Sequence, residues 1–164
     1  MTRCWPLCAG LLLFAGVAVA EPPALTGNGS REPVEIAADR LEADDVAKTL
    51  IFIGHAVAKQ GDIIINGDRL TIHYAAQGGD VDRIVAEGNV RITQGERVAT
   101  GNRADYFRAE ERMVLTGSPR VSEGANSVQG HEIVLFIKEN RSVVKSGQDG
   151  RVNAVFQPKG EGTR

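Results

Sequence analysis

Hydrophobic and polar residues alternate along most of the chain that follows Pro33. Val34 and Ile36 flank Glu35, and a similar period of two residues returns in segment after segment, which is typical of strands with one buried face. No window keeps apolar residues at i, i+3, i+4 and i+7. Glycine occurs 19 times in 164 residues, which disfavours helices of ordinary length. The pattern therefore predicts an all-β protein.

Residues 54–70 show the repeating unit most clearly. They read as one strand, a tight turn at Gln60-Gly61-Asp62, a second strand, and a break at Asn66-Gly67 that opens a third. Similar hairpins are expected at Gln94-Gly95-Glu96 and Glu123-Gly124-Ala125. Because an isolated hairpin is only marginally stable, repeated hairpins predict a continuous antiparallel sheet.

Two series of motifs recur about every 30 residues and interleave, as in repeat proteins. The first series is a set of four-residue anchors, and the second is a glycine that follows each apolar strand. The anchors are Ala38-Asp39-Arg40-Leu41, Gly67-Asp68-Arg69-Leu70, Gly101-Asn102-Arg103-Ala104 and Gly130-His131-Glu132-Ile133, and the glycines are Gly54, Gly88, Gly117 and Gly147. Between them, polar turns reverse the chain at residues 43–45, 77–80, 109–111 and 138–140. About four repeats predict on the order of a dozen short strands.

Alternation assigns side chains to two faces, and a slip of one residue would expose the whole apolar set, so the register should be firm. The apolar face is expected to carry Val34, Ile36, Leu50, Phe52, Ala56, Ala58, Ile63, Ile65, Leu70, Ile72, Tyr74, Ile84, Ala86, Val90, Ile92, Tyr106, Met113, Leu115, Val121, Val128, Ile133, Leu135 and Ile137. The opposite face is expected to carry Glu35, Thr49, Lys59, Asp62, Arg69, Thr71, His73, Arg83, Arg91, Thr93, Arg120, Glu132 and Lys138. Ile51, Ile53 and Ile64 are apolar at outward positions, either as ordinary exposed residues or as a contact between molecules.

The N-terminus has the character of a secretory signal peptide over residues 1–20. Arg3 gives a positive start, residues 7–19 are apolar, and Ala18-Val19-Ala20 is a small-residue cleavage site. A retained membrane anchor is the alternative, although the segment is short for one. Residues 21–33 are rich in Pro, Gly and small polar residues and read as a flexible leader, and residues 158–164 as a flexible tail. Both cysteines lie in the signal peptide, so the exported domain has no disulfide, which suits a periplasm.

Composition narrows the choice of partners and leaves the nature of the apolar face open. A formal net charge of −2 without a basic stripe argues against nucleic acid and against anionic membrane surfaces. Aromatic residues make up only 5% of the chain, and the apolar face is rich in Ile, Val, Leu and Ala. Such a face is either a packed sandwich core or an interior lined for fatty acyl chains, and periodicity does not separate the two.

Catalytic and metal-binding motifs are not found. His55, His73 and His131 lack the spacing and carboxylate companions of a zinc site, and no G-x-S-x-G or mature cysteine supplies a nucleophile. The pairs Asp44-Asp45 and Glu110-Glu111 fall in turns, where solvated carboxylates are ordinary. Asp39-Arg40 and Asp68-Arg69 are candidates for surface ion pairs of small energetic value. We expect no catalytic residue, metal or cofactor.

Several of these segments resemble the OstA-like family. They are residues 33–41, 52–57, 60–62, 67–70, 85–90 and 115–117, and the resemblance extends over roughly residues 34–157, which would be one OstA-like domain. The order and spacing of the motifs carry it, although the third and fourth anchors depart from Asp-Arg-Leu. The resemblance implies an open-ended, twisted antiparallel β-jellyroll built from repeated hairpins, and a role other than catalysis.

The function implied by the resemblance is periplasmic transport of lipopolysaccharide from the inner to the outer membrane. Acyl chains of lipid A would lie inside the jellyroll, and copies would stack head-to-tail into a bridge. The implied partners are lipopolysaccharide, another copy of the chain, an LptC-like subunit of an inner-membrane export complex at the N-terminal edge, and the N-domain of an LptD-like outer-membrane translocon at the C-terminal edge. Val34 and Ile36 would form the first edge, and residues 142–156 the second.

Candidate lipid-lining residues come from two sources. The resemblance points to Val34, Ile36, Phe52 and Ile92, and face assignment alone adds Leu50, Ile63, Ile65, Leu70, Ile72, Leu115, Ile133 and Leu135. Arg40 and Arg69 are expected either to reach lipid phosphates or to form surface ion pairs.

Three alternatives remain open at the level of sequence. The chain could be an LptC-like or other OstA-domain transport component, an exported structural β-repeat protein without a ligand, or a jellyroll enzyme of cupin type. A retained N-terminal membrane helix would indicate the first alternative. The absence of lipid binding would indicate the second, and a tightly bound metal would indicate the third.

Overall fold

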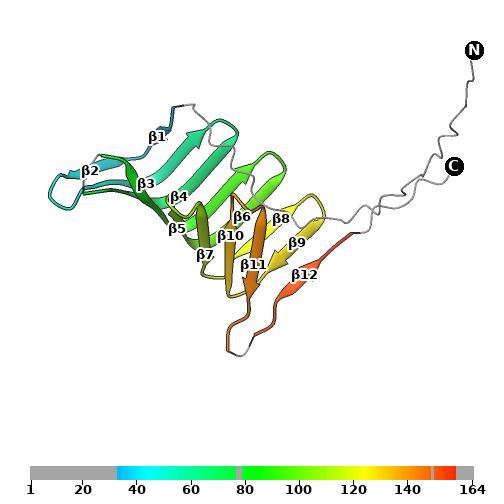
Figure 1. The fold of residues 1–164 in the computed structure, drawn as a ribbon. Helices are drawn as coiled ribbons and strands as arrows, with labels where there is room; N and C mark the ends of the chain where they lie inside the picture. Colours follow the sequence, from blue (N-terminus) through cyan, green and yellow to red (C-terminus); the bar gives the residue numbers. More distant parts are fainter. Residues whose placement is uncertain (1–32, 77–78, 149, 158–164) are drawn as a thin grey trace, which may run out of the picture.

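The computed structural model describes residues 33–76, 79–148 and 150–157, which form a single antiparallel sheet of twelve strands (Figure 1). The predicted signal peptide, almost all of the leader and the tail lie outside the described residues. The described part contains no helix long and apolar enough to cross a membrane. The strands are β1 Glu35–Ala37, β2 Arg40–Asp44, β3 Thr49–Gln60, β4 Ile63–Tyr74, β5 Val81–Gln94, β6 Arg97–Phe107, β7 Arg112–Thr116, β8 Arg120–Glu123, β9 Asn126–Gln129, β10 Glu132–Phe136, β11 Arg141–Lys145 and β12 Asn153–Val155.

The sheet consists of two walls that share the long strands β3 to β6. Pairing register shifts in the middle of these strands, between Ile53 and Ala56 and again between Glu87 and Val90, so the halves of each strand belong to different walls. Wall A contains β1, residues 56–60, 63–66, 90–94 and 97–101, β8, β9 and β12. Wall B contains β2, residues 49–53, 69–74, 81–87 and 103–107, β7, β10 and β11.

The chain crosses between the walls along one line, which we call the corner, and it does so with a small residue followed by a polar one. The crossings are Ala38-Asp39, Gly54-His55, Gly67-Asp68, Gly88-Asn89, Gly101-Asn102, Gly117-Ser118, Gly130-His131 and Gly147-Gln148. The two interleaved series in the sequence are therefore neighbouring crossings of this corner. Strand-to-strand pairing, rather than separate stacked units, produces the period of about 30 residues.

At three crossings, those of Gly54, Gly88 and Gly117, glycine is required for two reasons, which Gly88 illustrates. Its φ of 73° lies in the left-handed region, which costs residues with a Cβ about 1–2 kcal/mol. A Cβ on Gly88 would also lie 2.8 Å from Cβ of Asp68 on the neighbouring crossing. Gly54 faces Asp39 and Gly117 faces Asn102 in the same way, and the amide of Asp39 donates a 2.9 Å hydrogen bond to the carbonyl of Gly54.

The strand break predicted at Asn66-Gly67 is wrong. β4 continues from Ile63 to Tyr74, and a register shift between Asn66 and Arg69 marks the corner inside it. A glycine beside a polar residue is the usual signal of a turn, but here backbone pairing on both sides keeps the strand intact through the bend. The predicted hairpin turns at Gly61, Gly95 and Gly124 are confirmed.

The core lies between the two walls, on the face that alternation predicted. One cluster contains Ile92, Ala99 and Val121 from wall A together with Leu115 and Ile133 from wall B, each at most 4% exposed. Because residues of both walls contact the same cluster, the interior faces of the walls pack against each other. The all-β architecture predicted from sequence is confirmed.

The outer face of wall B differs from the prediction, because a row of residues along its middle is covered. Thr71, expected in solvent, is 9% exposed, and Val85 and Val134 are 3% and 6% exposed. Register places them in one row that contains Ile51, Thr71, Val85, Asp105, Val114, Val134 and Val143. The rows on either side carry long charged and aromatic side chains, whose stems can cover the shorter side chains between them.

Replacing Gly88 by alanine should destabilise the domain more than the same change at Gly95. Both glycines have positive φ, 73° and 57°, but a Cβ on Gly95 meets nothing within 4 Å. Gly95→Ala should cost about 1 kcal/mol from backbone conformation alone, and Gly88→Ala should cost more because Asp68 must move. The free energies of unfolding in urea measure the difference, and equal costs would contradict the steric role of the corner.

Candidate functional site

The space between the walls is closed in its C-terminal half. Leu115, Ile133 and Leu135 are at most 2% exposed, and Ile92 of wall A is 1% exposed. Met113 and Val121 complete this packing at 7% and 4%. In this half the apolar face is a packed core, as one of the two interpretations of the sequence proposed.

The N-terminal half of the same interior is more open. Leu50, Phe52, Ile63 and Ile65 are only half-buried, although their positions in the strands face the interior. Leu41, which pairs with Phe52 on the edge strand β2, is 54% exposed. The interior therefore presents aliphatic surface near the N-terminal edge and a sealed core near the C-terminal edge.

The twelve predicted lining residues follow this gradient with two exceptions, because Leu70 and Ile72 are buried at 3% and 7% although they pair with Phe52 and Leu50 in the more open half. The fully buried members are Leu70, Ile72, Ile92, Leu115, Ile133 and Leu135, and the half-buried members are Ile36, Leu50, Phe52, Ile63 and Ile65. Val34 precedes β1 and is 54% exposed. Nine of the twelve belong to the core cluster or pack against it, and the other three are Val34, Leu50 and Ile72.

Sequence reasoning missed two groups of interior residues. Leu41 and Ala99 fall at interior positions but were not assigned, because short strands and a single alanine give weak alternation. Polar residues at the interior positions next to the hairpin turns of wall A were also missed, among them Gln94, Arg97 and Glu123. Gln94 and Glu123 lie one step of alternation beyond Ile92 and Val121 but beside turns, where polar residues usually face water, and Arg97 is placed with them by its pairing to both.

Exposed large hydrophobic side chains gather at the two ends of the sheet. Val34 and Leu41 lie at the N-terminal edge, and Val152, Val155 and Phe156 lie at the C-terminal edge, with exposures between 41% and 60%. Figure 1 shows β1 and β2 at one end and β11 and β12 at the other. In the described part of the chain each of these four strands pairs with one neighbour, so each presents an unpaired edge.

The outer face of wall B carries a network of charges around Asp105. Arg83 and Arg103 both form ion pairs with Asp105, whose side chain is 12% exposed, and Arg103 also contacts Glu87. Burial by itself raises the pKa of Asp105, but hydrogen bonds from Arg103 and Arg83 outweigh it and lower the pKa below its usual value. The carboxylate is therefore held ionised and fixes the neighbouring strands β5 and β6 together.

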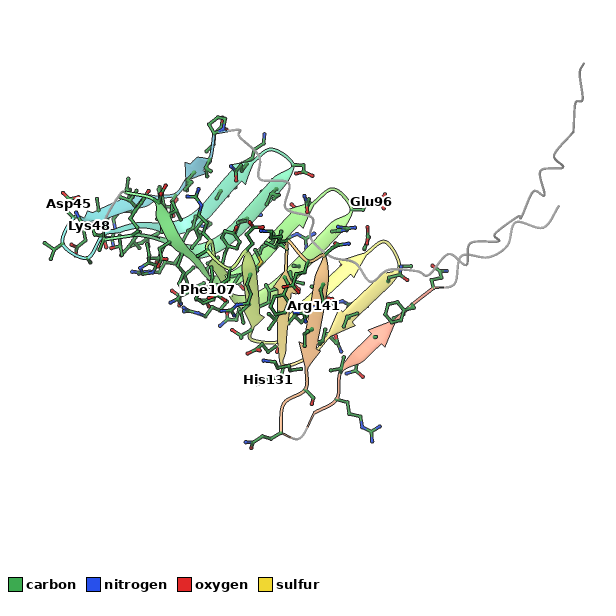
Figure 2. The ribbon with its side chains drawn as sticks, viewed as in Figure 1. Asp45, Lys48, Glu96, Phe107, His131 and Arg141 are labelled. Atoms are coloured by element: carbon green, nitrogen blue, oxygen red, sulfur yellow. The ribbon has the colours of Figure 1, made fainter. Side chains whose placement is uncertain are left out.

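Aromatic rings and arginines alternate along the rim of the same face, where Figure 2 labels Phe107 and Arg141. The guanidinium of Arg112 lies 4.4 Å from the centre of the Phe107 ring, and that of Arg141 lies 3.9 Å from the Phe136 ring. Arg112 also pairs with Glu110 at 2.6 Å. Arg83, Arg112 and Arg141 of this rim each have both an aromatic ring and a carboxylate beside them.

The predicted Asp39-Arg40 and Asp68-Arg69 ion pairs are wrong. Arg40 pairs with Glu42 at 2.7 Å, while Asp39 lies 2.8 Å from Nδ1 of His55 and Asp68 accepts a hydrogen bond from Asn89. Neighbouring residues of a strand point to opposite faces, so Asp and Arg in sequence cannot pair easily. The hydrogen bond to Asp39 raises the pKa of His55, which is exposed on the corner.

The described residues contain no group of three or more His, Cys, Asp or Glu side chains placed to hold a metal ion. Burial raises the pKa of Tyr106, which works against an ionised phenolate.

A comparison with protein-family models decides the family. Residues 35–141 match the model described as the LptA/(LptD N-terminal domain) LPS transport protein family. The chain belongs to this family. Its members are transport proteins rather than enzymes, in agreement with the expectation from sequence, and the resemblance to the OstA-like family is confirmed.

Two further proteins are similar to this chain. An uncharacterized protein of Rhizobium meliloti (strain 1021) is 30% identical over 103 residues, which cover 56% of this chain and 55% of that protein. The chain thus matches about half the length of this relative. The crystal structure of LptH, the LptA homologous periplasmic component of the lipopolysaccharide transport device from Pseudomonas aeruginosa, matches with a TM-score of 0.71 and 21% identity, covering 80% of this chain and all of LptH. The predicted jellyroll-like fold is thereby confirmed.

Proposed function

We propose that this protein carries lipopolysaccharide between the inner and outer membranes by shielding lipid A acyl chains between its two walls. The observation that carries the proposal is the half-buried aliphatic surface of Leu50, Phe52, Ile63 and Ile65 at the open half of the interior. Each methylene removed from water contributes about 0.8 kcal/mol, so a lipid with several chains needs such a covered apolar path to leave a membrane.

Stacking of copies end to end would extend this path. The directions of the strands at the two ends of the sheet support such stacking. Each wall contains eight strands that alternate in direction, so the last strand of one copy would run antiparallel to the first strand of the next. β11 would then pair with β2, and β12 with β1, which covers edges that otherwise favour aggregation. The exposed side chains at the two ends, such as Leu41 and Phe156, would meet at this junction.

The same edges would dock the other components of a transport bridge. An LptC-like subunit of an inner-membrane complex would add to the N-terminal edge, and the N-domain of an LptD-like outer-membrane protein to the C-terminal edge. The signal-peptide character of residues 1–20 supports a periplasmic location. Family membership and the periplasmic relative LptH support this assignment.

Lipid binding should depend on Ile65 but not on its neighbour Ile64. Ile65 pairs with Ala58 and Ile92 on the interior face, whereas Ile64 pairs with Lys59 and Thr93 on the outer face, and both are half-buried. Ile65→Glu should abolish displacement of a fluorescent lipid A analogue, because it brings a carboxylate into the acyl path. Ile64→Glu should bind normally and serves as the matched control.

Equal binding by both variants, each with a wild-type circular dichroism spectrum, would contradict an interior lipid path. Failure of the wild-type protein to bind the analogue at all would instead favour an exported structural protein with a closed core.

Head-to-tail stacking predicts complementation between two blocked variants. Leu41→Asp should block the N-terminal edge and Phe156→Asp the C-terminal edge, so each variant alone should be monomeric. A mixture should form dimers, because one intact edge of each kind remains. Sedimentation velocity measures this, and a mixture that stays monomeric while the wild type oligomerises would contradict the head-to-tail arrangement.

A further inference from the structure

The interior of wall A ends in a row of polar side chains, which we call the polar lip. It consists of Gln60, Gln94, Arg97, Glu123 and Asn126, with Ile63 among them in register order. Each lies two residues further from the corner than a residue of the interior row Ala58, Ile65, Ile92, Ala99, Val121 and Val128. Because alternate residues of a strand share a face, the polar lip belongs to the interior.

Burial supports this placement. The hairpin turns beside the lip are exposed at Gly95 and Glu96, and Figure 2 labels Glu96 at the tip of the β5–β6 hairpin. Gln94 and Arg97, which flank that turn, are nevertheless half-buried, and the side chain of Arg97 is 26% exposed. The lip residues thus lie against the mouth of the interior rather than extending into solvent.

The chemistry of the lip is hydrogen bonding without net charge. Nε of Arg97 donates to Oε1 of Glu123 at 3.0 Å, which balances the one cation with the one anion. Gln60, Gln94 and Asn126 add three carboxamides, and each of these groups carries donors and an acceptor. Oδ1 of Asn126 accepts a 2.8 Å hydrogen bond from the amide of Gln157, and Nε2 of Gln94 donates to Oδ1 of Asp62 at 3.5 Å. A row of this kind suits hydroxyl and amide groups more than it suits an isolated phosphate, for which it offers no excess positive charge.

Wall B has a different composition at the corresponding depth. The row there contains Leu50, Ile72, Ile84, Tyr106, Met113 and Leu135, of which Tyr106 has the only polar group. Ile72, Met113 and Leu135 of this row are buried, whereas Leu50, Ile84 and Tyr106 are half-buried. The accessible mouth is therefore amphipathic near Leu50, Ile84 and Tyr106, with an apolar side on wall B and a hydrogen-bonding side on wall A. An amphipathic lipid that enters the mouth has one orientation in which its acyl chains face wall B and its polar groups face wall A.

We propose that the polar lip is a specificity subsite that binds the hydroxyl- and amide-bearing region next to the acyl chains of a glycolipid. This inference rests on the proposed function, because it assumes that acyl chains occupy the interior. The chains lie toward wall B and the corner, while the lip exchanges hydrogen bonds with the polar region of the lipid. The lip distinguishes a glycolipid from a plain fatty acid of the same chain length.

The test compares two probes, lipid A and a saturated C16 fatty acid, on the full chain. The variant Arg97→Met/Glu123→Met removes the ion pair as a unit, which avoids leaving one charge unpaired. Its affinity for lipid A should fall about tenfold, the equivalent of one or two hydrogen bonds, while its affinity for the fatty acid stays unchanged. The control Arg141→Met/Glu139→Met removes an equally short pair, 2.9 Å, from the outer rim and should change neither affinity.

Gln94→Leu provides a second variant with no change in charge. Like the double variant, it should lower the ratio of the affinity for lipid A to the affinity for the fatty acid. An unchanged ratio in a folded lip variant would overturn the subsite while leaving interior lipid binding intact. If wild-type protein bound neither probe, the proposed function itself would fail, and the subsite with it.

Discussion

The bend of the chain at the corner is the constraint on which the rest of the structure depends. β3 to β6 belong to both walls, so the walls cannot exist unless each of these strands turns at the same line. The turn needs left-handed backbone at sites such as Gly54 and Gly88, and it needs space for the polar residue on the next crossing. The same backbone requirement, repeated at neighbouring crossings, therefore sets where the corner lies. It also makes the two walls face each other and determines the volume between them.

The two halves of the interior are packed differently. Leu115, Ile133 and Leu135 are sealed at the C-terminal half and supply the cohesion that a domain without disulfides requires. On the outer face of wall B, Val85 and Val134 are also buried, at 3% and 6% exposed. The N-terminal half leaves Leu50 and Phe52 only half-buried, and this is where we propose that a lipid replaces water.

Much of the fold could be predicted because it follows from local rules. A period of two residues identified the strands and the interior face, and glycine with a polar neighbour identified both hairpins and corners. The same signal could not separate a corner from a turn, which is why Asn66-Gly67 was read as a break in a strand. The difference depends on pairing partners far along the chain, such as Arg91 opposite Asn66.

The candidate site was harder to predict for the same reason. Alternation placed Leu115 and Phe52 on one face but could not show that one is sealed and the other half-buried, since packing depends on the opposite wall. Thr71 was expected in solvent because threonine is polar, yet it is only 9% exposed. The polar lip was missed because polar residues beside turns usually face water, and only register with Ile92 and Val121 assigns Arg97 and Glu123 to the interior.

The central claim is that acyl chains of lipopolysaccharide occupy the open half of the interior, and photo-crosslinking in cells tests it most directly. A photoreactive residue would replace Phe52, with a second at Lys59, an exposed outer position on the same strand, as control. The account predicts a lipopolysaccharide adduct at position 52 and none at position 59. An exported, folded protein with no adduct at position 52, or with equal adducts at both positions, would contradict it.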